Sequence, residues 1–214
     1  MRTWTATDMG KLIYRLKASF LTFFGDIRYS KYPPFLFYDD VDFSVKGGNV
    51  EALMKLLKNG DVLMRGFDSY VDSFFIRSSR GYSHAGIYSG NGEVIHATAP
   101  KVAKEHLIDF CRCDRIAVLR PRKGVTKALS LARKFLKNGV FYDFSYTAGN
   151  SALYCFELAA CCYQNLSISK KKATALFGML RKKEKVYLSD SFLESKDFTL
   201  VYEFNPKFGI VRKR

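Results

Sequence analysis

Two short apolar segments joined by a tight turn are the feature that most restricts how this chain folds. Residues 82–88 and 93–98 are rich in β-branched and aromatic residues, and Ser89-Gly90-Asn91-Gly92 lies between them. Asn-Gly between two such segments is the strongest short-range signal of a β-hairpin. We therefore expect an antiparallel pair of strands in the middle of the chain.

This hairpin carries two of the three histidines of the chain, His84 and His96. They are 12 residues apart, and the midpoint between them is Gly90, inside the turn. The two positions are therefore expected roughly opposite each other, and the even separation is compatible with one shared face of the sheet. One imidazole can then bind the other and fix its tautomer, which is the support that a catalytic base needs.

A cysteine near the start of a later helix is a candidate partner for these histidines. Residues 151–164 are nearly all apolar and predict a buried helix, with Asn150 or Ser151 as its N-cap. Cys155 then lies in the first turns, where the helix dipole stabilises a thiolate. A neighbouring imidazolium would give a thiolate–imidazolium pair near neutral pH. A cysteine on an apolar helix is, however, usually a simple core residue, so both interpretations stay open.

The remaining elements predict an α+β domain that begins at Gly48. An arm, residues 1–47, is expected to pack on the core formed by residues 48–214. Asp61 and Arg65, on the first core strand, are expected to order its edge through polar contacts. The predicted helices cover residues 50–57 and 123–138, and the further predicted strands cover residues 61–65, 116–119 and 198–204.

The net charge of +15 favours an anionic partner, which is nucleic acid, an acidic lipid surface or an acidic protein. The basic runs Lys170–Lys172 and Arg181–Lys183 lack interleaved aromatic residues, so nucleic acid is not the expected partner. The arm offers an alternative to packing on the core, which is contact with an anionic membrane surface. The apolar face of the arm consists of Ile13, Leu16, Phe20, Phe23 and Phe24. Its basic residues are Lys11, Arg15 and Lys17.

The N-terminal residues predict neither a secretory signal nor a membrane span. The apolar stretch 12–24 contains Arg15 and Lys17 and is shorter than the roughly 20 residues that a spanning helix needs. A cytoplasmic protein, or one peripheral to a membrane, is expected. The five cysteines are an odd number and lack zinc-site spacing, so we expect mostly free thiols and neither a metal nor an organic cofactor.

Three segments resemble a known enzyme superfamily. Residues 82–97 resemble the histidine motif of NlpC-type cysteine peptidases, and Leu153-Tyr-Cys-Phe-Glu-Leu resembles their cysteine motif. Gly60-Asp-Val-Leu-Met-Arg-Gly is similar to the opening strand of the YiiX-like branch, in which the cysteine motif follows the histidine motif. The resemblance covers residues 60–204. It implies an α+β, papain-like fold in circular permutation, with an antiparallel, barrel-like sheet packed against the nucleophile helix.

The resemblance also implies roles for individual residues. Cys155 would be the nucleophile, His84 the general base and His96 the orienting third member of a triad. Many relatives have an acidic residue where His96 stands, but Glu93 is at an odd separation from His84 and would face away from it. Tyr154 and Tyr82 are candidate residues of the oxyanion hole or pocket.

The implied reaction is hydrolysis of an amide, peptide or isopeptide-like bond through an acyl-enzyme, without a cofactor. Two alternatives use the same cleft. The first is a lipid-directed acyltransferase or thioesterase that accepts an acyl-lipid substrate, and the second is a catalytically inactive binding module.

Overall fold

The computed structural model describes residues 10, 12–13, 15–16, 19–20, 27–31, 34–38, 43–68, 80–144, 146, 151–172, 185–207 and 209–212. Its helices are α2 (Gly47–Leu56), α4 (Leu107–Phe110), α5 (Val125–Lys137), α6 (Cys155–Cys162) and α7 (Ser189–Leu193). Its strands are β1 (Ile27–Lys31), β2 (Pro34–Tyr38), β3 (Val62–Gly66), β4 (His84–Gly90), β5 (Glu93–Ala97), β6 (Val102–His106), β7 (Arg115–Pro121), β8 (Lys171–Lys172), β9 (Lys185–Val186), β10 (Phe198–Asn205) and β11 (Gly209–Arg212).

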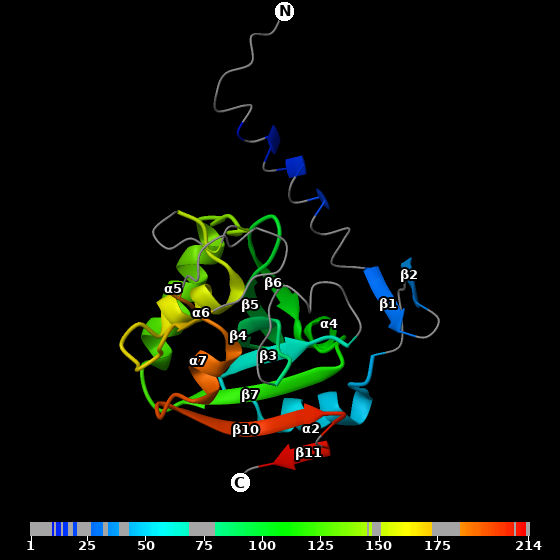
Figure 1. Cartoon of the computed structure of the whole chain (residues 1–214). Coiled ribbons are helices and arrows are strands. Elements are labelled where there is room, and N and C mark those ends of the chain that lie inside the picture. Colours follow the sequence, from blue (N-terminus) through cyan, green and yellow to red (C-terminus); the bar gives the residue numbers. More distant parts are fainter. Residues whose placement is uncertain are drawn as a thin grey trace, which may run out of the picture.

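One seven-stranded sheet forms the centre of the molecule, in the order β11-β10-β7-β3-β4-β5-β6 (Figure 1). Every strand pairing in it is antiparallel. The predicted α+β class and antiparallel sheet are therefore confirmed. The described strands leave β11 and β6 as two separate edges, so the sheet is open and does not close into a barrel.

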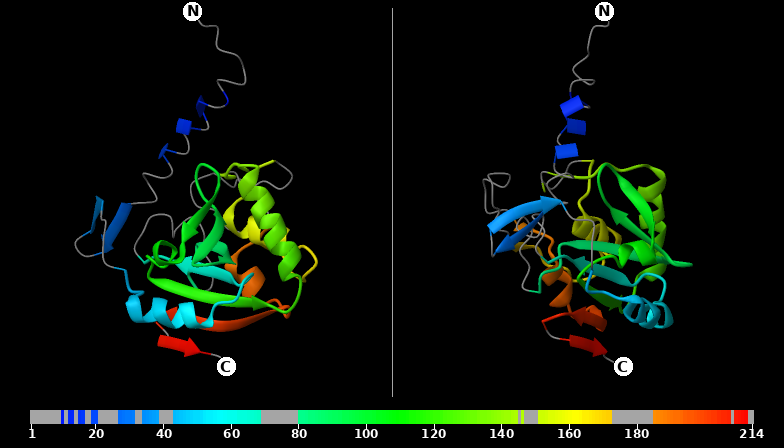
Figure 2. Two further views of the ribbon diagram at one scale, coloured as in Figure 1. Left: turned by 180° about the vertical axis from the view of Figure 1, so that it is seen from behind. Right: turned by 90° about the vertical axis from the view of Figure 1, so that its right-hand side faces the viewer.

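Apolar clusters cover both faces of this sheet. On β3, Val62 and Met64 pack in one cluster with residues of α5, α6 and α7, whereas Leu63 packs in a second cluster with Leu53 of α2 and Phe110 of α4. Figure 2 shows the same arrangement, with α2 beside β7 and β10 and with α5 beside α6. Both faces of β3 are buried, which is why Val62, Leu63 and Met64 are consecutive apolar residues rather than alternating with polar ones.

Several element boundaries differ from the predicted ones in ways that matter for the site. Strand β4 continues to Gly90, so the turn consists of Asn91 and Gly92 alone, both with positive φ as a type I′ turn requires. Helix α6 begins at Cys155 and has Tyr154 as its N-cap, four residues later than expected. Strand β6 and the short helix α4 were not predicted.

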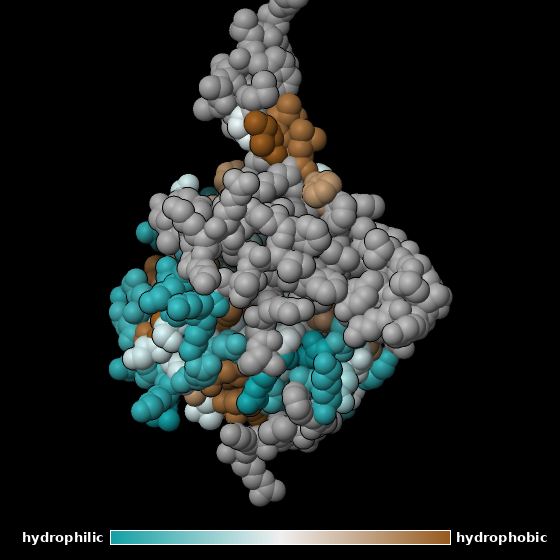
Figure 3. Space-filling view, in the orientation of Figure 1, coloured by the Kyte–Doolittle hydropathy of each residue, from teal (hydrophilic) through white to brown (hydrophobic). Residues whose placement is uncertain are grey.

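The N-terminal arm is described only in part, and its division from the domain at residue 47 stays a prediction. Its described positions between 10 and 20 are helical, and Ile13, Leu16 and Phe20 are each more than half exposed. These three side chains are therefore largely exposed, and the packing of the arm on the core stays a prediction. Figure 3 shows hydrophobic surface on this N-terminal segment. The arm also contains an unpredicted hairpin of β1 and β2. Lys11, Lys17, Phe23, Phe24, Asn150 and Arg181–Lys183 lie outside the described residues.

Among the described helices, none is both long enough and apolar enough to cross a membrane.

Candidate active site

The two hairpin histidines meet in the structure, but they are diagonal neighbours rather than directly opposite. His96 on β5 pairs with Gly86 on β4, two residues beyond His84, because the turn lies at Asn91–Gly92 rather than around Gly90. A bulge between Tyr88 and Gly90 shifts the pairing by one residue, from Ile87 to Gly86, and so brings the two histidines to the same face of the sheet. The side chains nevertheless reach each other, with His84 Nε2 2.7 Å from His96 Nδ1. This bond uses Nε2 of His84 and Nδ1 of His96. The other nitrogen of the His84 ring, Nδ1, takes no part in it.

The absence of a side chain at Gly86 makes this diagonal contact possible. A Cβ built there would lie 2.5 Å from Val94 Cγ1, 3.1 Å from Phe110 Cε2 and 3.2 Å from His96 Cβ. A distance of 2.5 Å is far below a normal carbon–carbon contact, so any side chain at this position would displace its neighbours. The space above Gly86 is instead filled by Phe110, whose ring centre lies 5.9 Å from that of His84 and 5.8 Å from that of His96.

Two charged residues, Glu105 and Arg65, lie on the strands on either side of the hairpin and contact each other beside the histidines. Glu105 on β6 is again diagonal to His96, which pairs directly with the small Ala103. Glu105 Oε2 lies 3.5 Å from His96 Nε2 and accepts a hydrogen bond of 3.2 Å from Arg65 Nη1. Arg65 pairs with His84 on β3, so its side chain spans the hairpin from one side to the other. The expected ordering role of Arg65 agrees with these contacts.

Arg65 is held in place by two contacts with Phe110 as well as by Glu105. Its guanidinium carbon lies 4.5 Å from the centre of the Phe110 ring, and Nη1 donates to the Phe110 carbonyl oxygen at 3.3 Å. A cation over an aromatic ring is a favourable electrostatic arrangement. Asp61, the other polar residue noted at this strand, lies apart from the site, where it accepts two hydrogen bonds from Arg120.

The thiol of Cys155 lies against the backbone on both sides of His84. Cys155 is fully buried, and its Sγ lies 3.8 Å from the Ser83 carbonyl oxygen. The backbone N–H groups of Ala85 and Phe156 also hydrogen-bond to the sulfur. As the first residue of α6, Cys155 lies where the helix has unpaired N–H groups and its positive dipole end. Among the described side chains, the thiol and the His84 imidazole share no hydrogen bond.

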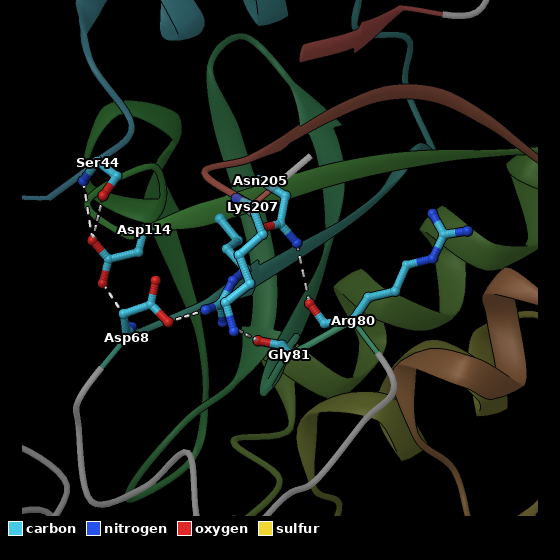
Figure 4. Close-up of polar contacts among 8 residues, drawn as sticks. Ser44, Asp68, Arg80, Gly81, Asp114, Asn205 and Lys207 are labelled. Atoms are coloured by element: carbon cyan, nitrogen blue, oxygen red, sulfur yellow. Dashed lines mark hydrogen bonds and ion pairs between the residues drawn. The ribbon is translucent and has the colours of Figure 1, made fainter. Parts of the chain in front are cut away.

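A polar network holds the residues that lead into β4, as Figure 4 shows. Arg115 on β7 donates to the Gly81 carbonyl oxygen at 3.2 Å and forms an ion pair with Asp68. The backbone N–H of Asp68 in turn donates to Asp114 at 2.7 Å. Gly81 has a φ of +75°, and a Cβ there would lie 2.5 Å from Arg115 Nη1. Glycine is thus required three residues before His84.

Burial favours the neutral forms of the Cys155 thiol and of both imidazoles in the free protein. Desolvation raises the pKa of the Cys155 thiol to about 11, although the hydrogen bonds from Ala85 and Phe156 lower it. Desolvation and then the Arg65 charge lower the pKa of His96 to about 3, and they hold that of His84 well below its usual 6.5. The expected thiolate–imidazolium pair is therefore not the resting state. A neutral thiol and two neutral imidazoles are present near neutral pH.

A protein-family model for permuted papain-like amidase enzymes, the YaeF/YiiX or C92 family, matches residues 56–202, which is well over half of the chain. The chain belongs to this family. No curated protein matches it. Membership in the C92 family confirms the predicted permuted papain-like fold and the predicted thiol-hydrolase class. The matched region contains the hairpin, β6 and α6, and so all the residues of the site described above.

The two tyrosines predicted for the pocket of this C92 amidase have structural contacts. The Tyr82 hydroxyl donates to Glu203 at 2.8 Å, and the Tyr154 hydroxyl accepts a hydrogen bond from the Tyr187 backbone N–H at 2.7 Å. Burial raises the pKa of both phenols. These contacts favour a packing role, and the part of either tyrosine in an oxyanion hole stays a prediction.

Sequence reasoning did not identify Glu105 or Phe110 as members of the site. The signal for β6 is weak because Lys104, Glu105 and His106 are consecutive polar residues, which hides the alternation of a strand. All five cysteines are free thiols, and burial raises the pKa of Cys111 and Cys162 to about 12 each.

Proposed function

We propose that this C92 amidase cleaves an amide bond, peptide or isopeptide-like, through an acyl-enzyme on Cys155, with His84 as general base and His96 as the residue that orients it. The observation that carries the proposal is the 2.7 Å bond between the two imidazoles, next to a thiol at the start of a helix. A base supported by a second group and adjacent to a nucleophile is the recurring arrangement of acyl-transfer enzymes.

In the proposed reaction, the proton moves as the bond forms, because the resting pair is neutral. The Cys155 sulfur attacks the carbonyl carbon while the S–H proton passes to His84 Nδ1. The oxyanion that forms is stabilised by backbone N–H groups at the start of α6. The His84 imidazolium then protonates the leaving amine, the C–N bond breaks and a thioester remains. Water attacks this thioester, His84 takes its proton, and the carboxylic acid leaves as the thiol recovers its hydrogen.

The acyl-enzyme is tested with p-nitrophenyl acetate, which acylates a reactive thiol without any need for the natural substrate. Intact and peptide mass spectrometry should locate the acetyl group on Cys155 in the wild type and find none there in Cys155→Ala. His84→Ala should acylate about 100-fold more slowly or worse, the usual contribution of a general base. Cys161→Ala is the matched control because Cys161 is a partly exposed thiol on the same helix. A wild-type Cys155 that does not acylate would favour the inactive binding module.

The bond that is cleaved is tested separately, by offering a mixture of peptide amides and a mixture of acyl lipids. If the wild type consumes peptide amides from the mixture and Cys155→Ala does not, the proposal is supported. Turnover of the acyl lipids alone would replace it with the lipid-directed acyltransferase or thioesterase. The nucleophile that resolves the acyl-enzyme, either water or an added alcohol or amine, distinguishes hydrolysis from transfer.

One observation favours a lipid-directed function, namely the exposed apolar side chains of the N-terminal arm. Ile13, Leu16 and Phe20 follow a helical spacing, and Arg15 is exposed beside them. Such a face binds the boundary between the headgroups and acyl chains of a bilayer, and basic residues attract it to anionic lipids. An anionic membrane surface is therefore proposed as a partner of the arm.

Vesicle flotation with phosphatidylserine-containing liposomes tests this partner. The full chain should float with the vesicles, and the triple change of Ile13, Leu16 and Phe20 to Ser should abolish flotation. Met54 and Ile108 are exposed apolar residues of the domain. Changing both to Ser provides the control, which should float like wild type. Equal flotation of the arm variant would exclude the arm as the membrane contact.

A further inference from the structure

We propose that Glu105 is a positioning residue that sets the tautomers of both histidines and thereby leaves His84 Nδ1 unprotonated. The inference rests on the proposed role of His84 as general base. Glu105 would act through His96 rather than on the reacting atoms. This role would explain why the polar contacts that begin at His84 on β4 continue through His96 on β5 to a carboxylate on β6.

The first step concerns which groups surround the Glu105 carboxylate. Its Oε2 atom receives Arg65 Nη1 at 3.2 Å and faces His96 Nε2 at 3.5 Å. The Arg65 contact is a hydrogen bond, whereas the His96 contact is slightly longer than usual and acts mainly through charge. An ionised carboxylate has only lone pairs to offer, so it favours a proton on the His96 nitrogen that faces it.

The second step follows the protons from His96 to His84. A neutral imidazole carries one N–H, so a proton on His96 Nε2 leaves His96 Nδ1 as an acceptor. The 2.7 Å bond to that atom must then be donated by His84 Nε2–H. His84 is also neutral, so its Nδ1 carries a lone pair. This is the nitrogen that the proposed reaction requires for taking the Cys155 proton.

The third step asks what would happen without the carboxylate. Arg65 would remain beside His96, because its contacts with Phe110 do not involve Glu105. A guanidinium has only N–H groups to offer and therefore favours a lone pair on His96 Nε2. The His96 proton would move to Nδ1, which would donate to His84 Nε2 and leave the His84 proton on Nδ1. That tautomer is unable to accept a proton from the thiol.

The geometry of the sheet supports a dedicated role for this residue. Glu105 and His84 are each diagonal to His96, and the residues directly opposite His96 on the two neighbouring strands are Gly86 and Ala103. Two small residues at these positions leave room for the long side chains to lean along the diagonal. Glu93 and Lys104 on the same strands form their own ion pair of 2.5 Å instead.

The test is ¹⁵N NMR of the imidazole nitrogens in the full chain at neutral pH, which reports tautomers directly. The chain has three histidines, and His106→Gln simplifies the spectrum to the two of interest. In the wild-type site, both His84 and His96 should carry the proton on Nε2. In Glu105→Leu, both should carry it on Nδ1. Glu105→Gln should keep the wild-type tautomers, because its amide oxygen still accepts from Arg65 and from His96.

Glu93→Gln is the matched control, since it removes a carboxylate from the same hairpin and should change neither tautomer. A wild-type spectrum with the proton on His84 Nδ1 overturns the proposal without any variant. Unchanged tautomers in a folded Glu105→Leu protein overturn it as well. Because the spectra need no substrate, their outcome is independent of whether the protein turns over any ester or amide.

The acylation rate of Cys155 by p-nitrophenyl acetate then links the tautomer to the chemistry. Glu105→Leu should lose about 100-fold or more, as a misdirected general base does, and Glu105→Gln should recover most of the rate. If the tautomers shift as expected but Cys155 acylates in no variant, the positioning role stands and the proposed function fails. If they shift and the rate does not fall, His84 Nδ1 is not the base and the functional part of the inference is wrong.

Discussion

Lowering the pH from 7 to 5 should destabilise the fold, and His96 should account for much of the loss. The side chain of His96 is 4% exposed, and burial followed by the Arg65 charge lowers its pKa from 6.5 to about 3. Between these two values the unfolded chain binds a proton that the folded protein does not bind. Stability therefore increases with pH across this window and falls as the pH drops below 6.5.

The size of the effect follows from the same two values. The pH falls about 1.5 units between the unfolded-state pKa of 6.5 and pH 5, and each unit lowers the free energy of unfolding by about 1.36 kcal/mol. His96 therefore accounts for a loss of about 2 kcal/mol in the free energy of unfolding. The lowered pKa of His84 acts in the same direction. The raised pKa of Glu105 acts in the opposite direction, since burial favours its protonated form. The His96 term is isolated by comparing variants rather than by the wild-type curve alone.

Urea unfolding at pH 7 and pH 5 measures this difference. With a urea m value of about 2 kcal/mol per M, the His96 term corresponds to a midpoint about 1 M lower at pH 5. His96→Gln should remove that part of the pH dependence, because glutamine does not titrate. His106→Gln is the control, since His106 is exposed, and it should keep the wild-type dependence. Equal pH dependence in wild type and His96→Gln would refute the reasoning.

Two further predictions concern packing and charge. Gly86→Ala should cost about 1–3 kcal/mol through overpacking, because its Cβ would meet Val94 Cγ1 at 2.5 Å. Gly47→Ala, where a Cβ meets nothing within 4 Å, should leave the urea midpoint nearly unchanged, and equal midpoints for the two variants would count against the close contact. Asp61→Ala should cost about 1–3 kcal/mol because it removes a buried carboxylate that pairs with the partly exposed Arg120. Glu51→Ala breaks only an exposed pair and should cost less than about 0.5 kcal/mol in the same thermal or urea assay.

Local patterns were sufficient for the hairpin, helix α6 and the fold class. Alternation and an Asn-Gly turn depend on neighbouring residues alone, so residues 82–98 predicted β4, β5 and the approach of His84 to His96. The apolar run after residue 151 likewise predicted α6, although its first residue is Cys155 itself. The start was misplaced because a cap is decided by backbone geometry that propensities describe only loosely.

Three features of the site depend on long-range packing and were not accessible from local pattern. The diagonal register of the histidines comes from the position of the turn, and their shared face comes from a one-residue bulge; a count of residues between them reveals neither. Glu105 joins His96 only because β6 pairs with β5 at a specific register, and its own segment has no clear strand pattern. The charge state depends on burial, because the low polarity around Cys155 and His96 favours their neutral forms. Residue types thus indicated which side chains could react, whereas burial and strand register determined which of them meet and which carry a proton.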